Sequence, residues 1–257
     1  MTSMFEKFRD LHQSDRLFIL PNAWDAKSAL LFQESEFPAV ATSSAAVAGA
    51  LGYQDGEGMP FADYLFVINR ILSTITIPLS VDIEMGYGTS DEAIFANVRK
   101  LAELGVAGIN IEDSIIQPSG RVLKDAGAFA QTIKYIKTRL QRENLQLFIN
   151  IRCDTFLLDV PDTPSETIRR LKLYDTTGAD GIFLPCIQTA EDIAMAVNHT
   201  SLPLNVMCLP GLPDFDTLDK LGVKRASMGP FLFGKVYDHV GRLSREIGIT
   251  KSFSPIL

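Results

Sequence analysis

The sequence repeats one unit about eight times: a short apolar run, a polar turn and a longer amphipathic stretch. The runs that we expect to be β-strands are Leu17–Pro21, Ala39–Ser43, Ile77–Glu84, Ala107–Glu112, Leu147–Arg152, Gly181–Pro185, Leu202–Met207 and Lys224–Met228. Strands that alternate with helices imply a parallel sheet, and about eight such units without a linker favour a closed barrel. We therefore predict one (β/α)8 (TIM) barrel domain over residues 1–257. The alternative is an open doubly wound sheet, but it normally needs fewer units, and no GxGxxG follows the first strand.

The overall composition narrows the class of protein. The net charge of −7 argues against an extended nucleic-acid surface. No apolar run approaches the ~20 residues of a membrane-spanning helix, and the first residues, MTSMFEKFRDL, lack the continuous apolar region of a signal peptide. The three cysteines form no CxxC pair, which suits a reducing compartment. We expect a cytoplasmic protein without nucleic-acid or membrane partners.

Polar side chains recur at alternate positions of the predicted strands. Because side chains alternate across a strand, Asp82 and Glu84 share the inward face of one strand, and Glu112 and Arg152 take the same face of the next two. Buried charges are costly unless they are paired or bound to a metal. Carboxylates that converge in this way suit Mg²⁺ or Mn²⁺. The alternative is a salt-bridge network with Arg152 that only stabilises the barrel mouth. An inward amide on a later strand, Asn205, is a weaker candidate, since it can simply satisfy backbone groups.

Two long connections follow predicted strands, Ser44–Met59 and Asp113–Gly127. Both lie on the side of a barrel that carries the active site, where long loops are usually lids or binding loops. Asp55 lies in the first of them; on its own, this residue is typical of a turn.

Several motifs together resemble the isocitrate lyase/phosphoenolpyruvate mutase superfamily, and the resemblance covers nearly the whole chain. The motifs are Pro21-Asn22-Ala23-Trp24-Asp25, Thr42-Ser43-Ser44, Gly52-Tyr53-Gln54-Asp55, Val81-Asp82-Ile83-Glu84-Met85-Gly86-Tyr87-Gly88, Ile111-Glu112-Asp113, Ile151-Arg152-Cys153-Asp154 and Leu202-Pro203-Leu204-Asn205-Val206-Met207. The DxE-GYG and ED elements in this order are the specific part.

The resemblance implies a Mg²⁺-dependent enzyme that acts on a small 2-oxo or 2-hydroxy acid. Such enzymes make or break a C–C or P–C bond next to a carbonyl through an enolate-like species. By carry-over, Asp82, Glu84 and Glu112 are the expected metal ligands, and Asp55 lies near the metal's waters. The expected catalytic residues are Asp55, Glu112 and Arg152, with Arg152 clamping the substrate carboxylate. The expected substrate-binding residues are Ser43, Ser44, Ala45, Asp82, Arg152 and Asn205.

The chain also departs from the pattern of the superfamily. Lyase members carry a Cys and a His in the loop that corresponds to Asp113–Gly127, and this chain has neither there. Arg121 and Lys124 do not fit the gating loop of phosphonopyruvate-type members, so we assign them no catalytic role. Our first hypothesis is a lyase or decarboxylase. The alternatives are phosphonate chemistry (a phosphonomutase or phosphonopyruvate hydrolase) and a barrel that only binds a metabolite.

The resemblance also suggests a homodimer or homotetramer in which the last helix is exchanged between subunits. The apolar spacing from Leu232 to Leu243 is compatible with that exchange. It is equally compatible with ordinary packing of the helix on its own barrel.

Overall fold

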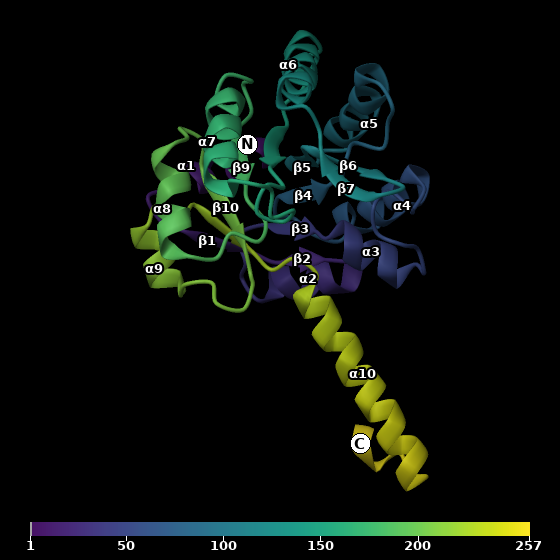
Figure 1. Ribbon diagram of the computed structural model, residues 1–257. Helices are drawn as coiled ribbons and strands as arrows, with labels where there is room; N and C mark the ends of the chain where they lie inside the picture. The colour runs from purple at the N-terminus through teal and green to yellow at the C-terminus, as the bar shows by residue number, and fades with distance from the viewer. Residues whose placement is uncertain (1) are drawn as a thin grey trace.

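The computed structural model describes residues 2–257 and shows a closed parallel sheet surrounded by helices (Figure 1). The strands of this sheet are β1 (Phe18–Leu20), β2 (Asn22–Ala23), β3 (Val40–Thr42), β4 (Leu79–Asp82), β5 (Gly108–Glu112), β8 (Phe148–Arg152), β9 (Gly181–Phe183), β10 (Leu204–Met207) and β11 (Arg225–Ser227). Their order is β1-β11-β10-β9-β8-β5-β4-β3-β2, and neighbouring strands in this order pair in parallel. Each predicted strand is therefore present.

The barrel closes because β1 and β2 are two halves of one strand. They are separated only by Pro21, which has no N–H to donate to a strand ladder. β1 pairs with β11, and β2 pairs with β3. The side-chain oxygen of Asn22 accepts hydrogen bonds from the backbone N–H groups of Met228 (3.0 Å) and Gly229 (2.9 Å), which ties the two edges together. The (β/α)8 prediction is confirmed, and the open sheet is excluded.

Helices cover the outside of the barrel. They are α2 (Ala26–Glu34), α3 (Ser44–Ala50), α4 (Phe61–Leu72), α5 (Asp91–Glu103), α6 (Ala126–Arg142), α7 (Thr163–Tyr174), α8 (Ala190–Asn198) and α9 (Phe215–Lys220). α5 shows why these segments are helical: the Ser90 hydroxyl accepts a hydrogen bond from the N–H of Ala93, and two acidic residues follow in the first turn. Its apolar face, with Ile94, Val98 and Leu101 buried, packs into the main core. Outward-facing strand residues such as Val81 complete that core.

The N-terminal end of the barrel is plugged by α1 (Met4–Gln13). Phe8 is fully buried and meets the Phe148 ring edge-on at 5.4 Å, while His12 stacks on the same ring at 4.0 Å. Burial, with a further contribution from the nearby Arg225, lowers the pKa of His12 to about 3, so the imidazole is neutral at pH 7. Because catalytic groups of this fold lie at the C-terminal ends of the strands, we look for the active site at the opposite end.

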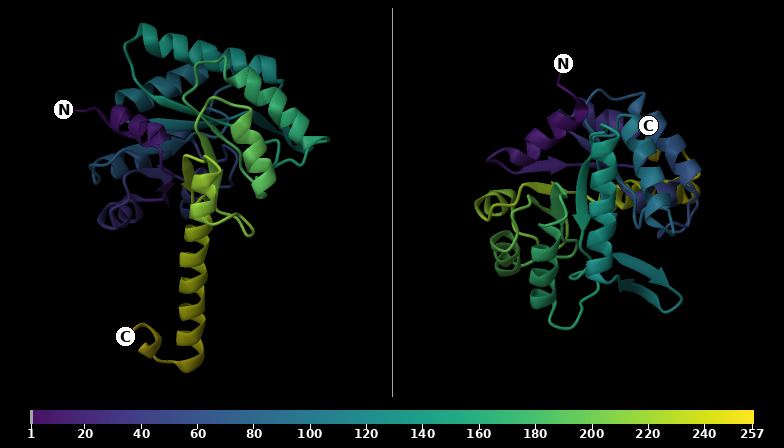
Figure 2. Two further views of the ribbon diagram at one scale, coloured as in Figure 1. Left: turned by 90° about the vertical axis from the view of Figure 1, so that its left-hand side faces the viewer. Right: turned by 90° about the horizontal axis from the view of Figure 1, so that it is seen from above.

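The segment Asp113–Gly127, expected to be a lid loop, contains a β-hairpin. Its strands β6 (Ser114–Gln117) and β7 (Gly120–Leu123) pair antiparallel, with Ser114 opposite Leu123. Figure 2 shows the hairpin reaching outward beyond the barrel strands. Since its base follows Glu112 directly, the hairpin is placed to act on the mouth of the barrel.

The last long helix, α10 (Phe231–Thr250), projects away from the barrel (Figures 1 and 2) and leads to a short 3-10 turn, η1 (Ser254–Ile256). None of the α10 residues is buried, and Val236 and Val240 are 40% and 51% exposed. The alternative in which this helix packs on its own barrel is therefore wrong. No helix of residues 2–257 has both the length and the hydropathy that crossing a membrane requires.

Candidate active site

A small polar cavity of about 170 Å³ lies at the C-terminal ends of the strands. The predicted site residues that line it are Ser43, Ser44, Ala45, Asp55, Asp82 and Arg152. Further lining residues, such as Asn110, Phe183 and Met207, come from β5, β9 and β10. Residues more than 100 positions apart in the sequence thus meet at the end of the barrel where catalytic groups of this fold are found.

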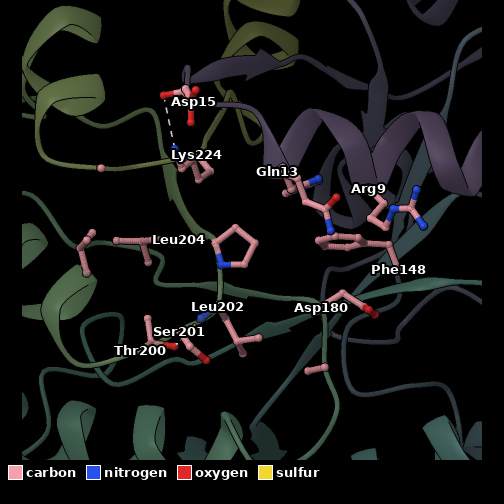
Figure 3. A pocket seen from close by; sticks show the side chains of 15 residues that line it. Arg9, Gln13, Asp15, Phe148, Asp180, Thr200, Ser201, Leu202, Leu204 and Lys224 are labelled. Atoms are coloured by element: carbon pink, nitrogen blue, oxygen red, sulfur yellow. Dashed lines mark hydrogen bonds between the residues drawn. The ribbon is translucent and has the colours of Figure 1, made fainter.

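A larger cavity of about 650 Å³ opens at the opposite end of the barrel (Figure 3). Its lining includes Arg9, Phe148, Asp180 and Lys224, which lie at α1 and at the starts of strands. The Lys224 ammonium donates a hydrogen bond to the backbone carbonyl of Asp15 at 3.3 Å. Because this end of a (β/α)8 barrel serves stability rather than chemistry, we take the smaller cavity as the candidate active site.

One wall of the cavity joins the end of β4 to the start of α3. Ser43 is the N-cap of α3, and its hydroxyl accepts a hydrogen bond from the N–H of Ala46 at 3.3 Å. The Ser44 hydroxyl donates to Oδ2 of Asp82 at 2.9 Å, while Oδ1 of Asp82 is buried without a hydrogen-bond partner in the described chain. Burial raises the pKa of Asp82, and Arg152 and Ser44 oppose that shift. This lone oxygen is suited to a cation, because a buried carboxylate is costly until it is paired.

The facing charge is Arg152, at the end of β8. Its Nε donates to Oδ1 of Asp154 at 2.7 Å, and its Nη1 lies 3.1 Å from Oε2 of Glu112. Burial disfavours the charge of Arg152, but Asp154 and Asp82 outweigh it and raise the pKa of the guanidinium. The Nη2 group also donates to Oδ2 of Asp154 at 3.4 Å, so these two buried carboxylates hold the planar guanidinium at the cavity wall.

Glu112, a predicted metal ligand and catalytic residue, does not line the cavity. It is fully buried, and one of its oxygens pairs with the guanidinium of Arg121 while the other faces Arg152. Arg121 comes from β7 and also donates to the Ser114 hydroxyl at 2.9 Å. No role for Arg121 could be inferred from the sequence, because only the pairing of β6 with β7 brings its guanidinium to Glu112.

Glu84 is also absent from the cavity wall, which corrects the expectation that it shares the inward face with Asp82. β4 ends at Asp82, and Glu84 has a φ of 51°, so strand alternation stops before it. Its carboxylate accepts hydrogen bonds from the N–H of Glu57 (2.6 Å) and from the Tyr87 hydroxyl (3.0 Å). Burial and the nearby carboxylates of Asp82 and Asp55 raise the pKa of Glu84 to about 7. Glu84 therefore anchors the loop that carries Asp55.

Asn205 lies below the cavity and is not among its lining residues, so direct substrate binding by this residue is not supported. Its amide nitrogen donates to the backbone carbonyl of Val206 at 2.6 Å, and its amide oxygen accepts from Arg225 at 2.7 Å. The amide that reaches the cavity is Asn110 of β5. Asn110 lies two positions before the predicted site residue Glu112, and strand alternation places both residues on one face, so the sequence does carry a signal for Asn110.

The assignment of Asp82, Glu84 and Glu112 as metal ligands stays a prediction. Within residues 2–257, no three or more His, Cys, Asp and Glu side chains are arranged to hold a metal ion. Mg²⁺, however, is commonly bound through one or two carboxylates and keeps several water molecules. The unpartnered oxygen of Asp82 fits such a site, and Asp55 lines the same cavity.

A (β/α)8 barrel whose strand ends combine an open carboxylate with a guanidinium fork has the form of an enzyme for small anionic substrates. The chain matches the model of the family described as phosphoenolpyruvate phosphomutase over residues 8–248, and it belongs to this family. It is thereby an enzyme of the phosphoenolpyruvate mutase/isocitrate lyase superfamily, which weighs against the binding-only alternative.

Three similar proteins illustrate the range of the family. An uncharacterized protein of Mycobacterium tuberculosis is 37% identical over 86% of this chain and 81% of its own length. Oxaloacetate decarboxylase 1 of Pseudomonas fluorescens is 28% identical over 84% of this chain and 75% of its own. The crystal structure of a putative phosphonomutase from Burkholderia cenocepacia superposes with a TM-score of 0.89 at 31% identity, covering 96% of this chain and 100% of the other. Both C–C and P–C chemistry are therefore represented.

Proposed function

We propose that the protein is a Mg²⁺-dependent lyase or decarboxylase that cleaves the C–C bond next to the carbonyl of a small 2-oxo or 2-hydroxy acid. The observation that carries this proposal is that one small cavity is lined by both Asp82, with its unpartnered oxygen, and Arg152. The carboxylate of Asp82 suits a cation, and the guanidinium of Arg152 suits a substrate carboxylate. The volume of about 170 Å³ is below the roughly 300–1,000 Å³ of ordinary ligand pockets, which favours a compact acid.

Each residue of the cavity has a role that follows from its chemistry. Arg152 would bind the substrate carboxylate through the guanidinium N–H groups that Asp154 and Glu112 leave free. The backbone N–H groups of Ser44 and Ala45, in the first turn of α3, have no intrahelical acceptor and are free to donate to a substrate oxygen. Asp82 would hold Mg²⁺ directly, and Asp55 would reach it through water. The bound ion supplies Lewis-acid stabilisation of the negative charge that develops on the carbonyl oxygen.

The second candidate is cleavage or rearrangement of a P–C bond. It is favoured by the likeness to the putative phosphonomutase of Burkholderia cenocepacia and by the matching family model. The same cavity would serve, since an enolate forms in both reactions. C–C cleavage comes first because a curated relative with a named activity, oxaloacetate decarboxylase 1 of Pseudomonas fluorescens, cleaves a C–C bond.

A substrate panel separates the two candidates. The purified protein with Mg²⁺ is incubated with oxaloacetate, dimethylmalate, 2-methylisocitrate and phosphonopyruvate, and the products are followed by proton and phosphorus NMR. We expect turnover of a 2-oxo or 2-hydroxy acid, which a chelator abolishes and Mg²⁺ restores. Turnover of phosphonopyruvate alone would replace the first candidate with the second.

We also propose that the protein is a homo-oligomer in which α10 packs against a second copy. The helix carries exposed Leu232, Val236 and Val240, and with α2 it borders an apolar groove that includes Trp24 and Leu31. A helix of 20 residues extends about 30 Å, and its apolar face is not covered by its own barrel.

The oligomer is tested by light scattering after size exclusion. We expect a multiple of 28.3 kDa for the wild type and a monomer for the Val236→Asp/Val240→Asp variant. Lys235→Glu, an exposed change on the same helix, should leave the mass of the assembly unchanged. A monomeric wild type would contradict the proposal.

A further inference from the structure

A guanidinium group lies inside the barrel beneath the candidate active site. Arg225 of β11 is 1% exposed, and no carboxylate of residues 2–257 forms an ion pair with it. Its Nη2 donates to the amide oxygens of Asn110 (2.8 Å) and Asn205 (2.7 Å), and its Nη1 lies 3.5 Å from His12 Nε2. Because a guanidinium has only donors, each amide that faces it must present its oxygen.

This contact fixes which end of Asn110 faces the cavity. The oxygen of Asn110 accepts a second hydrogen bond from the amide nitrogen of Asn150 at 2.9 Å. A flipped amide would place its NH₂ against two donors, Arg225 and Asn150, and would leave each of them only the amide oxygen of Asn205 as an acceptor. The amide oxygen of Asn110 is therefore held against Arg225 and Asn150. The amide nitrogen of Asn110 has no hydrogen-bond partner anywhere in the described chain, and this residue lines the cavity.

Asn205 shows the contrasting case. Its amide oxygen accepts a hydrogen bond from the same guanidinium. Its amide nitrogen, however, donates to the backbone carbonyls of Val206 (2.6 Å) and Arg225 (3.2 Å). Of the two amides that Arg225 orients, only Asn110 has a free donor at the cavity. This unpartnered donor faces the cavity and is available to an acceptor oxygen of the ligand.

We propose that Asn110 is a substrate-binding residue whose amide nitrogen donates a hydrogen bond to an oxygen of the bound 2-oxo acid, and that Arg225 is a positioning residue that sets this orientation. This inference rests on the proposed function and adds a specificity element to it. The site then selects a substrate with an acceptor oxygen opposite β5, in addition to the carboxylate that Arg152 binds. The positive charge of Arg225 behind Asn110 further favours an anion in the cavity.

The Asn110→Asp variant tests the donor. It keeps the size of the side chain and an oxygen for Arg225, but it replaces the NH₂ donor with an acceptor. We measure the Kd of oxalate with Mg²⁺ by calorimetry, kcat/KM for the substrate found in the panel, and Tm. The expected result is a Kd increased about 10- to 150-fold, with a matching loss of kcat/KM, and a Tm no lower than that of the wild type, since Arg225 gains a carboxylate. The exposed Asn69→Asp change on α4 should alter neither activity nor Kd.

A double-mutant cycle tests the positioning role of Arg225. Arg225→Met should weaken oxalate binding in the presence of Asn110 but not in the Asn110→Ala background. If the wild type neither binds oxalate nor turns over any substrate, the proposed function fails, and this inference fails with it. If the wild type is active and Asn110→Asp stays within threefold of it, only this inference is overturned. If Arg225→Met does not fold, the Asn110→Asp result decides alone.

Discussion

The Arg152→Met variant is expected to lose about 30- to 5,000-fold in kcat/KM for the 2-oxo acid substrate. Truncating one partner of a buried, hydrogen-bonded charge pair typically costs about 2–5 kcal/mol, and a tenfold loss of rate corresponds to about 1.4 kcal/mol. Arg152 is held for this contact by Asp154 and Glu112, so its fork is in place before the substrate arrives. The Arg152→Lys variant keeps the positive charge but loses the planar guanidinium. Its kcat/KM should lie between that of the wild type and that of Arg152→Met.

Arg169→Met provides the matched control for that measurement. Arg169 forms an exposed ion pair with Glu166 on α7, so the same substitution there should leave kcat/KM unchanged. Circular dichroism and Tm establish that each variant is folded. An Arg152→Met enzyme that retains activity within threefold of the wild type would show that another cation binds the substrate carboxylate.

Much of the fold could be predicted because hydrophobic burial imposes a period on the sequence. Strands such as Phe148–Arg152 alternate apolar and polar residues, and the structure places Ile149 and Ile151 in the main core while Asn150 forms hydrogen bonds within the barrel. The direction of α10 could not be predicted in the same way. An amphipathic helix has the same spacing whether its apolar face meets its own barrel or another chain.

The candidate site was predictable where strand geometry holds and not where it ends. Asp82 and Arg152 are the last residues of their strands, so alternation placed them correctly at the cavity. Glu84 itself has a positive φ after the strand has ended, and no periodic rule applies to its side chain. Arg225, next to Lys224 at the start of a short strand, shows no sign in the sequence that its guanidinium is buried. That burial depends on amides from β5 and β10 that only the closed barrel brings together.

The Asp82→Asn variant is expected to separate function from stability. If Asp82 holds the metal, its replacement by a neutral amide should lower kcat/KM at least about 10³-fold, the equivalent of about 4 kcal/mol of Lewis-acid stabilisation. It should also raise the Kd of Mn²⁺ measured by electron paramagnetic resonance. In the presence of a chelator the effect on stability should have the opposite sign. Burial raises the pKa of Asp82 above its ordinary value, so the ionised group costs folding free energy at pH 7.

The metal-free Asp82→Asn protein should therefore unfold at a temperature equal to or above that of the metal-free wild type. Ser44 can still donate to the amide oxygen, so its hydrogen bond need not be lost. Asp216→Asn, an exposed change in the first turn of α9, serves as the control and should alter neither metal affinity nor activity. A variant that is inactive and also less stable without metal would show that Asp82 is a structural residue. If the variant binds Mn²⁺ as tightly as the wild type, Asp82 is not a metal ligand, and the metal binds elsewhere.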